Sequence, residues 1–310
     1  MKKSEMNIIK NNNLNPLFIG FGKQALEYAK VFKHLNVGIA AAYIRNFEKN
    51  KKNLQKYGVE HIYTDLKKAL KENKYNSVFV FLPWNLIDEK IAFILRHTTK
   101  CVYSEKPLAL SIKKLLYIDN LTKKLNRKLF ILYNRRYYFT YNFLKKKISK
   151  KRIEFLVNIP ERRNYLIENI DPKLDGNIKY HLTSHWVDFF TSLFNITISS
   201  VHKKKDSYFF KFKGKNADKN LININYDAKG SIYAEIKTSK ETYLLKTLEK
   251  VYKVNSKTKK HELLVDEKKL NKFKPGILNL IKNIKNKKKL ILPKTHDLIK
   301  IYRYLEKLPY

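Results

Sequence analysis

Two histidines and an aspartate in the stretch "HLTSHWVDFF", residues 181–190, have the spacing of a functional helix face. His181, His185 and Asp188 stand at positions i, i+4 and i+7, which fall within a narrow arc at 3.6 residues per turn. Imidazole nitrogens bind metals, transfer protons or serve as satisfied polar groups of a core. The stretch therefore predicts a helix, and the rest of the chain has to decide which chemistry its face performs.

Zinc binding is the least supported role for this pair of histidines. The residues between them are Leu-Thr-Ser, whereas a zinc peptidase carries a Glu next to its first His. The chain has one cysteine, Cys101, so we expect neither a cysteine-rich metal cluster nor a disulfide framework. We expect no metal site. A packing role and a role in substrate contact or proton transfer both stay open.

A glycine turn near the N-terminus has the pattern of a dinucleotide site. In "PLFIGFGKQALEYAKVF" an apolar run precedes the turn and a helical pattern follows it, as the G-x-G-x-x-G/A motif requires. Gly20 permits the tight turn, Gly22 lets a pyrophosphate approach the backbone, and Ala25 allows close helix packing. N–H groups at the helix start would bind the phosphate. The cofactor contacts expected here are Gly20, Phe21, Gly22, Lys23 and Gln24.

Strands and helices alternate through the rest of the first half of the chain. The strands are "NVGIAAAYI", "EHIYT", "SVFVFLP" and "KCVYSEKPLAL", and helical patterns separate them. Such alternation predicts right-handed crossovers and a parallel sheet covered on both faces. The first half is therefore expected to be a dinucleotide-binding domain. Leu82 and Pro83, which end the third of these strands, are assigned to the cofactor site.

The end of "NVGIAAAYI", the first strand after the glycine turn, indicates which cofactor is bound. An Asp or Glu at this place usually binds the adenosine ribose hydroxyls, but "AAYIRNFEK" has Ile44 there, followed by Arg45. An acid would repel a 2'-phosphate, whereas an arginine binds one. The sequence therefore favours NADP over NAD, although Arg45 is also readily explained as a solvated surface residue.

Four cues in order, spread over residues 15–195, resemble the Gfo/Idh/MocA family of oxidoreductases. They are the glycine turn, the segment Glu105-Lys106-Pro107 after a strand, the segment "YNRRYY" and the later helix with histidines. The run "KLFILYNRRYY" is interpreted as a strand. The resemblance implies an α/β Rossmann N-terminal domain and an α+β C-terminal domain with a large, mostly antiparallel open sheet. It also implies a cis peptide before Pro107.

The chemistry implied by the resemblance is hydride transfer between a nicotinamide and a sugar, nucleotide sugar or related polyol. The family's frequent use in surface-carbohydrate pathways gives a weak preference for nucleotide sugars. Lys106 matches the family lysine that lies between cofactor and substrate, where it would exchange the proton of the reacting hydroxyl. Glu105 and Lys106 are also expected to contact the cofactor.

His185 matches the family histidine that faces substrate, and His181 occupies the position where Asp is more usual. We expect both to contact substrate or share proton transfer with Lys106, whereas Asp188 is interpreted as a structural acid. An imidazole cannot supply the fixed negative charge of the usual Asp. Further candidates for substrate binding are Tyr133, Asn134, Arg136 and Arg163. The alternative for "YNRRYY" is that its aromatic residues are core and its arginines surface.

The chain after residue 150 contains short runs rich in β-formers without intervening helices, which indicates an antiparallel sheet. We therefore expect an N-terminal tail at 1–14, a Rossmann domain at 15–135 and a substrate-binding and oligomerisation domain at 136–310. The family resemblance implies a homo-oligomer formed through the C-terminal sheet.

The composition limits the remaining functions. A balance of 66 Lys+Arg against 27 Asp+Glu, net +39, would suit nucleic acid, but the cations are spread from end to end and no reading motif accompanies them. We expect no specific nucleic-acid partner. No apolar run is long enough to span a membrane, so a cytoplasmic protein is the simplest interpretation. A second hypothesis is a dinucleotide-binding sensor or partner protein of the same fold with altered catalysis, motivated by His181 and Ile44.

Overall fold

The computed structural model describes residues 14–149, 151–161, 164, 167–168, 176–205, 207–213, 219–226 and 228–308. These residues form two compact units. The first contains the described residues up to Ala109, together with Lys113–Leu132 and Ile277–His296. The second contains Leu110–Ile112, Tyr133–Gly276 and the residues from Asp297 onward. The segment Ile277–His296 thus packs with the first unit, although the domain boundary expected at residue 135 would place it in the second.

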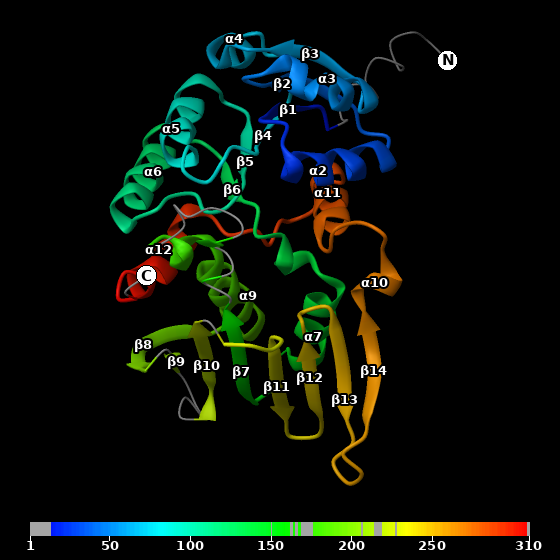
Figure 1. Ribbon diagram of the computed structural model, residues 1–310, viewed down its shortest axis with the longest axis vertical. Coiled ribbons are helices and arrows are strands. Elements are labelled where there is room, and N and C mark those ends of the chain that lie inside the picture. The colour runs from blue at the N-terminus through cyan, green and yellow to red at the C-terminus, as the bar shows by residue number, and fades with distance from the viewer. Residues whose placement is uncertain are drawn as a thin grey trace. The chain divides into compact units, whose positions relative to one another are not determined.

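A parallel sheet of six strands forms the centre of the first unit (Figure 1). Its order is β3-β2-β1-β4-β5-β6, which is the order of a Rossmann sheet with its switch point between β1 and β4. The strands are β1 (Pro16–Ile19), β2 (Ile39–Tyr43), β3 (Val59–Tyr63), β4 (Ser77–Val80), β5 (Cys101–Ser104) and β6 (Leu129–Ile131). Every residue of β1 and β4 is buried, as expected for central strands of a covered parallel sheet.

Helices connect these strands and complete the core of the first unit. They are α2 (Lys23–His34), α3 (Phe47–Lys56), α4 (Leu66–Lys71), α5 (Ile87–His97), α6 (Ile112–Lys124) and, much later in the chain, α11 (Ile277–Lys285). The Phe18 ring of β1 meets Phe32 of α2 edge-on, with centroids 5.4 Å apart. Helix α11 packs beside α2, and Lys285 Nζ donates to the carbonyl of Leu35 at 2.8 Å. These contacts hold α2, and with it the glycine turn, against the sheet.

The second unit is built on an eight-stranded sheet of order β14-β13-β12-β11-β7-β10-β9-β8. All neighbours are antiparallel except β7 and β10, which are parallel. The strands are β7 (Ile153–Glu161), β8 (Thr197–Lys204), β9 (Ser207–Lys213), β10 (Leu221–Tyr226), β11 (Tyr233–Thr238), β12 (Thr242–Lys246), β13 (Lys250–Val254) and β14 (His261–Asp266). The helical segments are η1 (Asn134–Tyr137), α7 (Phe139–Ile148), η3 (Lys179–Thr183), α9 (Ser184–Phe194), α10 (Glu267–Leu270) and α12 (Thr295–Leu305).

Helices cover one face of this second sheet. Phe155 of β7 stacks on Phe194 of α9 with ring centroids 4.0 Å apart, and Tyr141 of α7 meets Phe189 of α9 edge-on at 5.4 Å. Residues alternate along the strands, so the neighbour of Phe155, Leu156, points to the opposite face and is 40% exposed. The sheet therefore has one buried face and one open face.

The expected fold class is confirmed in both units, and the structure adds detail that the sequence patterns did not predict. Helix α6 and strands β8 and β13 were not anticipated. The strand interpretation of "KLFILYNRRYY" holds only for β6, because the chain turns into the 3-10 helix η1 at Asn134. The peptide bond Lys106–Pro107 is cis, as the family resemblance implied.

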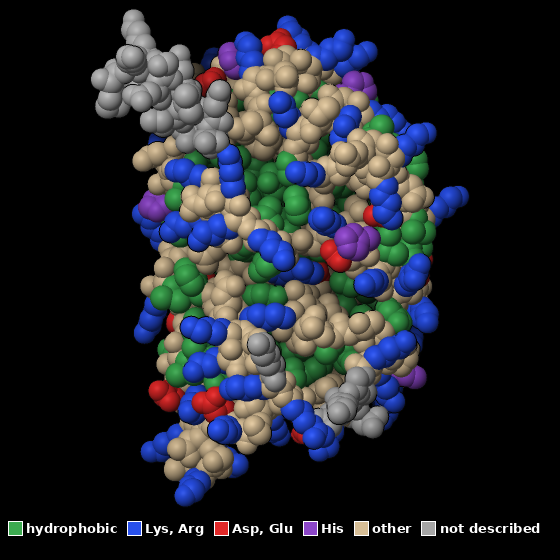
Figure 2. All heavy atoms as spheres, turned by 180° about the vertical axis from the view of Figure 1, so that it is seen from behind, with side chains coloured by type: hydrophobic (Ala, Val, Ile, Leu, Met, Phe, Trp, Pro, Cys, Tyr) green, Lys and Arg blue, Asp and Glu red, His purple; other side chains and the backbone are tan. Residues whose placement is uncertain are grey.

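The face of the protein seen in Figure 2 is basic. Figure 2 shows Lys and Arg side chains dispersed over the whole visible face, with few Asp or Glu between them. Dispersed cations raise general adhesion to polyanions, whereas a specific nucleic-acid site concentrates them on one element. Within the described residues, no helix has both the length and the apolar composition to cross a membrane.

Gly276 gives a direct test of local packing, because its φ of +81° favours glycine and a Cβ there would lie 2.1 Å from the carbonyl oxygen of Asn134. We expect Gly276→Ala to lower the free energy of unfolding by about 2–4 kcal/mol, measured by urea denaturation followed by circular dichroism. Gly38→Ala is the control, since its Cβ would meet only Glu60 Oε1 at 3.8 Å. Equal stability of Gly276→Ala and the native chain would contradict the packing described.

Candidate active site

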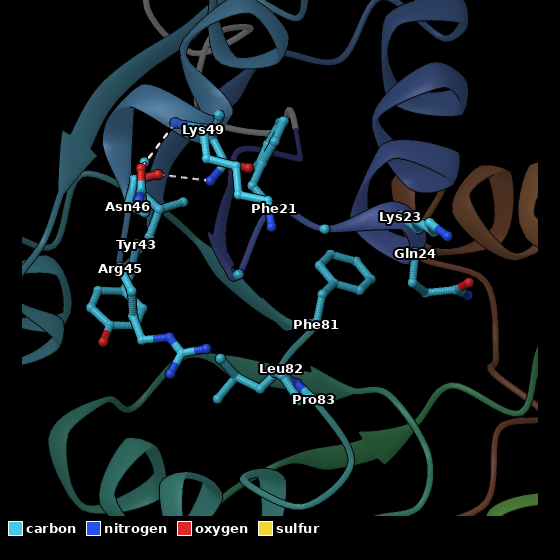
Figure 3. Close-up of a pocket in the computed structure, with 14 residues that line it drawn as sticks. Phe21, Lys23, Gln24, Tyr43, Arg45, Asn46, Lys49, Phe81, Leu82 and Pro83 are labelled. Atoms are coloured by element: carbon cyan, nitrogen blue, oxygen red, sulfur yellow. Dashed lines mark hydrogen bonds between the residues drawn. The ribbon is translucent and has the colours of Figure 1, made fainter. Parts of the chain in front are cut away.

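A cavity of about 660 Å³ opens at the carboxyl ends of β1, β2 and β4, which is the switch point of the first sheet. The glycine turn, the end of β2 with the start of α3, and the end of β4 each contribute a part of its wall (Figure 3). The lining residues are Gly20, Phe21, Gly22, Lys23, Gln24, Tyr43, Ile44, Arg45, Asn46, Lys49, Asn50, Phe81, Leu82 and Pro83. Open α/β sheets bind their ligands at this place.

The glycine turn fits a dinucleotide phosphate. Gly20 has φ +91°, and a Cβ there would lie 2.7 Å from the Phe81 carbonyl oxygen, so the turn can pack against the end of β4 only with glycine. A Cβ on Gly22 would meet no atom within 4 Å, which leaves open space for a ligand to approach the backbone. Gly22 is the N-cap of α2 and has no side chain that could accept hydrogen bonds from the first N–H groups of the helix. Such N–H groups suit an anion.

The part of the cavity after β2 is basic. Ile44 is buried, and its N–H donates to the carbonyl of Tyr63 at 2.9 Å, so it supplies no polar group to the cavity. Arg45 and Lys49 line the cavity, and none of its described lining residues is acidic. Asn46 caps α3 by accepting a hydrogen bond from the Lys49 N–H at 2.9 Å (Figure 3).

The segment Glu105-Lys106-Pro107 follows β5, the strand beside β4. The Glu105 N–H donates to the Val80 carbonyl at 2.9 Å, which continues the pairing of the two strands to their carboxyl ends. The buried Glu105 carboxylate accepts a hydrogen bond from Gln24 Nε2 at 2.9 Å. Glu105 is thus tied to the glycine turn through a residue that lines the cavity. Lys106 is half-buried at the same edge of the sheet.

In the second unit, the 3-10 helix η1 is attached to α9 by an ion pair. Arg136 Nε donates to Asp188 Oδ2 at 2.9 Å, and Nη2 donates to Oδ1. Burial disfavours the charge of Arg136, but the Asp188 carboxylate outweighs this effect and raises the pKa of Arg136. Asp188 is 1% exposed, in agreement with its interpretation as a structural acid. Arg136 therefore has a carboxylate partner within its own unit.

Tyr133 and His185 lie together on the same pair of segments. The Tyr133 hydroxyl donates to Ser184 Oγ at 3.0 Å, and its ring meets His185 edge-on with centroids 4.9 Å apart. Burial, with a contribution from Asp188, raises the pKa of Tyr133. His185 is 5% exposed in the first turn of α9, whereas His181 is half-buried in the π-helix η3 that precedes it. His181 therefore lies in the π-helix and His185 in the α-helix, so the two histidines do not belong to one continuous α-helix.

Eight of the ten residues assigned to the cofactor from sequence line the cavity, and Glu105 and Lys106 do not. Asn134 is 7% exposed, and its Nδ2 donates to the Pro275 carbonyl at 2.9 Å. Arg163 lies outside the described residues. Among the described residues, no group of three or more His, Cys, Asp or Glu side chains could hold a metal.

Asn46 and Lys49 line the cavity but were not predicted from the sequence. Their signal was present in "RNFEKN", because Asn directly after a strand predicts the N-cap of the next helix and therefore a place at the ligand edge.

Comparisons with known proteins agree with this geometry. Residues 14–133 match the model of the Gfo/Idh/MocA oxidoreductase family, described as an NAD-binding Rossmann fold. A comparison with curated proteins gives no match.

Solved structures with the same fold extend over nearly the whole chain. The dehydrogenase MviM from Clostridium difficile is 20% identical with a TM-score of 0.72, and 96% of this chain and 98% of that chain are covered. The super-repressor mutant of Gal80p from Saccharomyces cerevisiae is 13% identical with a TM-score of 0.73, covering 96% and 95%. A levoglucosan dehydrogenase in complex with NADH and levoglucosan is 13% identical with a TM-score of 0.73, covering 95% of each chain. At these identities the likeness shows the fold.

The glycine turn, the Rossmann strand order and the matched model agree on one family. The cavity at the switch point is the place where that family's Rossmann domain binds its dinucleotide. Residues 14–133 match the NAD-binding Rossmann domain of the Gfo/Idh/MocA oxidoreductase family, and the likeness of the remaining residues to solved structures shows their fold.

Proposed function

We propose that this protein is an NAD(P)-dependent dehydrogenase or reductase that acts on a CH–OH group of a sugar, nucleotide sugar or related polyol. The observation that carries the proposal is the common edge of the first sheet, where the dinucleotide cavity and the Glu105-Lys106-Pro107 segment follow neighbouring strands. The family match supports hydride transfer. The levoglucosan dehydrogenase of the same fold is consistent with a carbohydrate substrate.

Lys106 is the proposed acid and base of this reaction. When bound, the nicotinamide supplies or accepts the hydride. The hydroxyl of the substrate loses its proton in one direction and regains it in the other, so a side chain that exchanges a proton near neutral pH is required. A lysine amine performs this role when partial burial and neighbouring charge lower its pKa. Lys106 is half-buried, and the Glu105 side chain next to it in sequence is fixed by Gln24.

His185 and His181 are proposed to contact the substrate from the second unit. The packing of His185 against Tyr133 restricts the orientation of its imidazole ring, as a residue that positions a substrate requires. The same packing would also suit a structural imidazole, so the proposed role of His185 rests on the sequence resemblance of its helix to the family and not on the matched family model, which ends at residue 133. His181, which is less buried, replaces an acid that is usual in the family.

NADP is the proposed physiological cofactor. The cavity places Arg45 and Lys49 after β2, and the position usually held by a ribose-binding acid is the buried Ile44. A 2'-phosphate carries additional negative charge that two cations stabilise. NAD lacks this group and would gain less from the same residues.

A regulatory dinucleotide-binding protein is the second candidate. His181 in place of the usual Asp removes a fixed negative charge, and the super-repressor mutant of Gal80p shows that a repressor can have this fold. The two candidates differ in one observable, because only the enzyme oxidises or reduces a substrate.

A homo-oligomer through the open face of the second sheet is also proposed. Strand pairing aligns one row across this face, in the order Leu221, Leu156, Glu235, Leu244, Tyr252 and Leu263. Five of the six are apolar or aromatic, and Leu156 and Leu263 are 40% and 41% exposed. A mostly apolar row, interrupted by Glu235, favours burial against a second copy.

Replacement of Lys106 tests the catalytic proposal. In a screen of polyols, sugars and nucleotide sugars with both cofactors, we expect Lys106→Ala to retain reduced-nicotinamide binding, followed by fluorescence, and to lose turnover by about 10²–10⁴-fold. Lys113→Ala, on the exposed surface of α6, is the control. Unchanged turnover in Lys106→Ala would refute its role. Tight cofactor binding without turnover of any compound by the native chain would favour the regulatory candidate.

Replacement of Asn46 by Asp tests the cofactor preference. Asp keeps the helix cap but adds a negative charge to the cavity, so we expect Asn46→Asp to weaken NADPH binding about tenfold and to leave NADH binding nearly unchanged. Arg45→Ala should have the same direction of effect, and Arg96→Ala, on the exposed face of α5, should have none. Calorimetry that gives equal affinities of the native chain for NADPH and NADH would contradict the preference.

Leu156→Asp tests the oligomer. We expect the native chain to sediment as an oligomer and Leu156→Asp to sediment as a monomer, because a second carboxylate beside Glu235 replaces an apolar contact and adds like-charge repulsion at the centre of the row. Leu116→Asp is a matched control, since Leu116 is 38% exposed on α6. A monomeric native chain at micromolar concentration would exclude the proposed interface.

A further inference from the structure

Two enclosed hydrogen-bond donors lie side by side in the second unit. The guanidinium of Arg135, from η1, stacks on the ring of Trp186, from α9, at 3.4 Å from its centroid. Arg135 Nη1 and Trp186 Nε1 are both enclosed, and neither has an acceptor among the described residues. A buried donor without an acceptor destabilises the folded state, and more so when it is charged. Two such donors in contact are therefore unusual for a structure that serves only the fold.

Because Arg135 is charged, the acceptor that suits the two unpaired donors is an anion. Arg136, the next residue, has Asp188 as its counter-ion, but Arg135 forms no ion pair with any described carboxylate. Burial lowers the pKa of Arg135 to about 10, against the opposing effects of Tyr138, Glu161 and Asp188. A neutral acceptor would satisfy the N–H groups but not the charge. An anionic oxygen would satisfy both.

The surrounding carboxylates do not supply that anion. Glu161, at the end of β7, acts on Arg135 through its charge but lies beyond ion-pair distance, and it accepts a hydrogen bond from Thr183 Oγ1 at 2.7 Å. Asp188 is bound to Arg136 through both of its oxygens. The Tyr138 hydroxyl also forms a hydrogen bond with Arg135, but its raised pKa keeps it uncharged at neutral pH.

The position of the pair connects it with the substrate. Trp186 follows His185, the proposed substrate contact, in the first turn of α9, and Arg135 lies between Asn134 and Arg136 in η1. The ion pair Arg136–Asp188 and the Tyr133–Ser184 hydrogen bond attach the same two segments to each other. The stacked pair is therefore held by rigid neighbours, as a specificity site requires.

We propose that Arg135 and Trp186 form an anion subsite that binds a carboxylate or phosphate group of the substrate. The planar guanidinium is fixed by stacking on the indole ring, so that Nη1 and Nε1 are presented to the oxygens of one anionic group. The substrate class is then an acidic or phosphorylated sugar, in place of a neutral polyol. Only the statement that the anionic group belongs to a substrate rests on the proposed function. Anion binding at Arg135 and Trp186 requires no catalysis.

The indole N–H of Trp186 provides a direct probe, because the chain has only two tryptophans. In ¹⁵N–¹H correlation spectra, the Trp186→Phe variant identifies the Trp186 signal. We expect this signal to move, with saturation, when inorganic phosphate or acetate is added at constant ionic strength, and to stay in place with chloride. Movement with phosphate alone would assign a phosphorylated substrate, and movement with acetate a carboxylate. A signal that responds to neither anion overturns the proposal, whatever the outcome of the Lys106→Ala experiment.

Matched variants separate the subsite from the general basicity of the chain. Arg135→Gln should weaken the response at least about tenfold, and Arg135→Lys, which keeps the charge but loses the planar fork, should weaken it to a smaller extent. Arg303→Ala removes one exposed arginine from the same unit and should leave the response unchanged. An equal response in the native chain and in folded Arg135→Gln would also overturn the subsite. Catalytic turnover plays no part in this readout, so its failure is distinct from a failure of the proposed enzyme function.

Discussion

The bidentate ion pair between Arg136 and Asp188 determines the arrangement of the candidate substrate residues in the second unit. Both groups are nearly removed from solvent, so each charge is tolerated only because the other is present. The pair fixes η1 on α9. Tyr133, Asn134 and Arg135 on one segment, and Ser184, His185 and Trp186 on the other, are placed by that attachment. The two sequence segments that resembled the family are thus parts of one polar cluster.

The first unit depends on a steric constraint. Gly20 approaches the Phe81 carbonyl so closely that a side chain would not fit, and this approach brings the glycine turn to the end of β4. Gln24, one residue before the tightly packed Ala25, then reaches Glu105. A lack of side-chain atoms at one residue therefore determines how the cofactor turn and the lysine-bearing segment are joined.

The sequence predicted the first unit well because the residue types within each short segment there reflect the packing of that segment in the fold. Gly20, Gly22 and Ala25 have residue types that the turn demands, and fully buried strands such as β1 and β4 appear as continuous apolar runs. The sequence predicted the second unit less completely. The parallel pairing of β7 with β10 joins strands far apart in the sequence, and no turn residue indicates it. The segment "YNRRYY" is rich in aromatic residues, as strands often are, although its centre forms the helix η1.

The candidate site shows the same division. The residues of the glycine turn that line the cavity were predicted from their spacing, because one contiguous motif contains them. The partner of Arg136 and the stacking of Arg135 on Trp186 join residues about 50 positions apart, so sequence spacing carries no information about them. The chain has 66 Lys and Arg residues, so the presence of a single cation in a sequence segment does not indicate a binding site.

The π-helix η3 allows the residues before α9 to change without a change in α9 itself. A π turn is an α-helix with one inserted residue, and it often arises at functional positions. Loss or gain of a single residue in Lys179–Thr183 would rotate everything before it by about 100° relative to α9, because each residue of an α-helix turns the chain by that angle. His185 and Asp188 would keep their positions while His181 moved to another face. The helix can therefore change which side chain it presents ahead of His185 without disturbing the ion pair that anchors it.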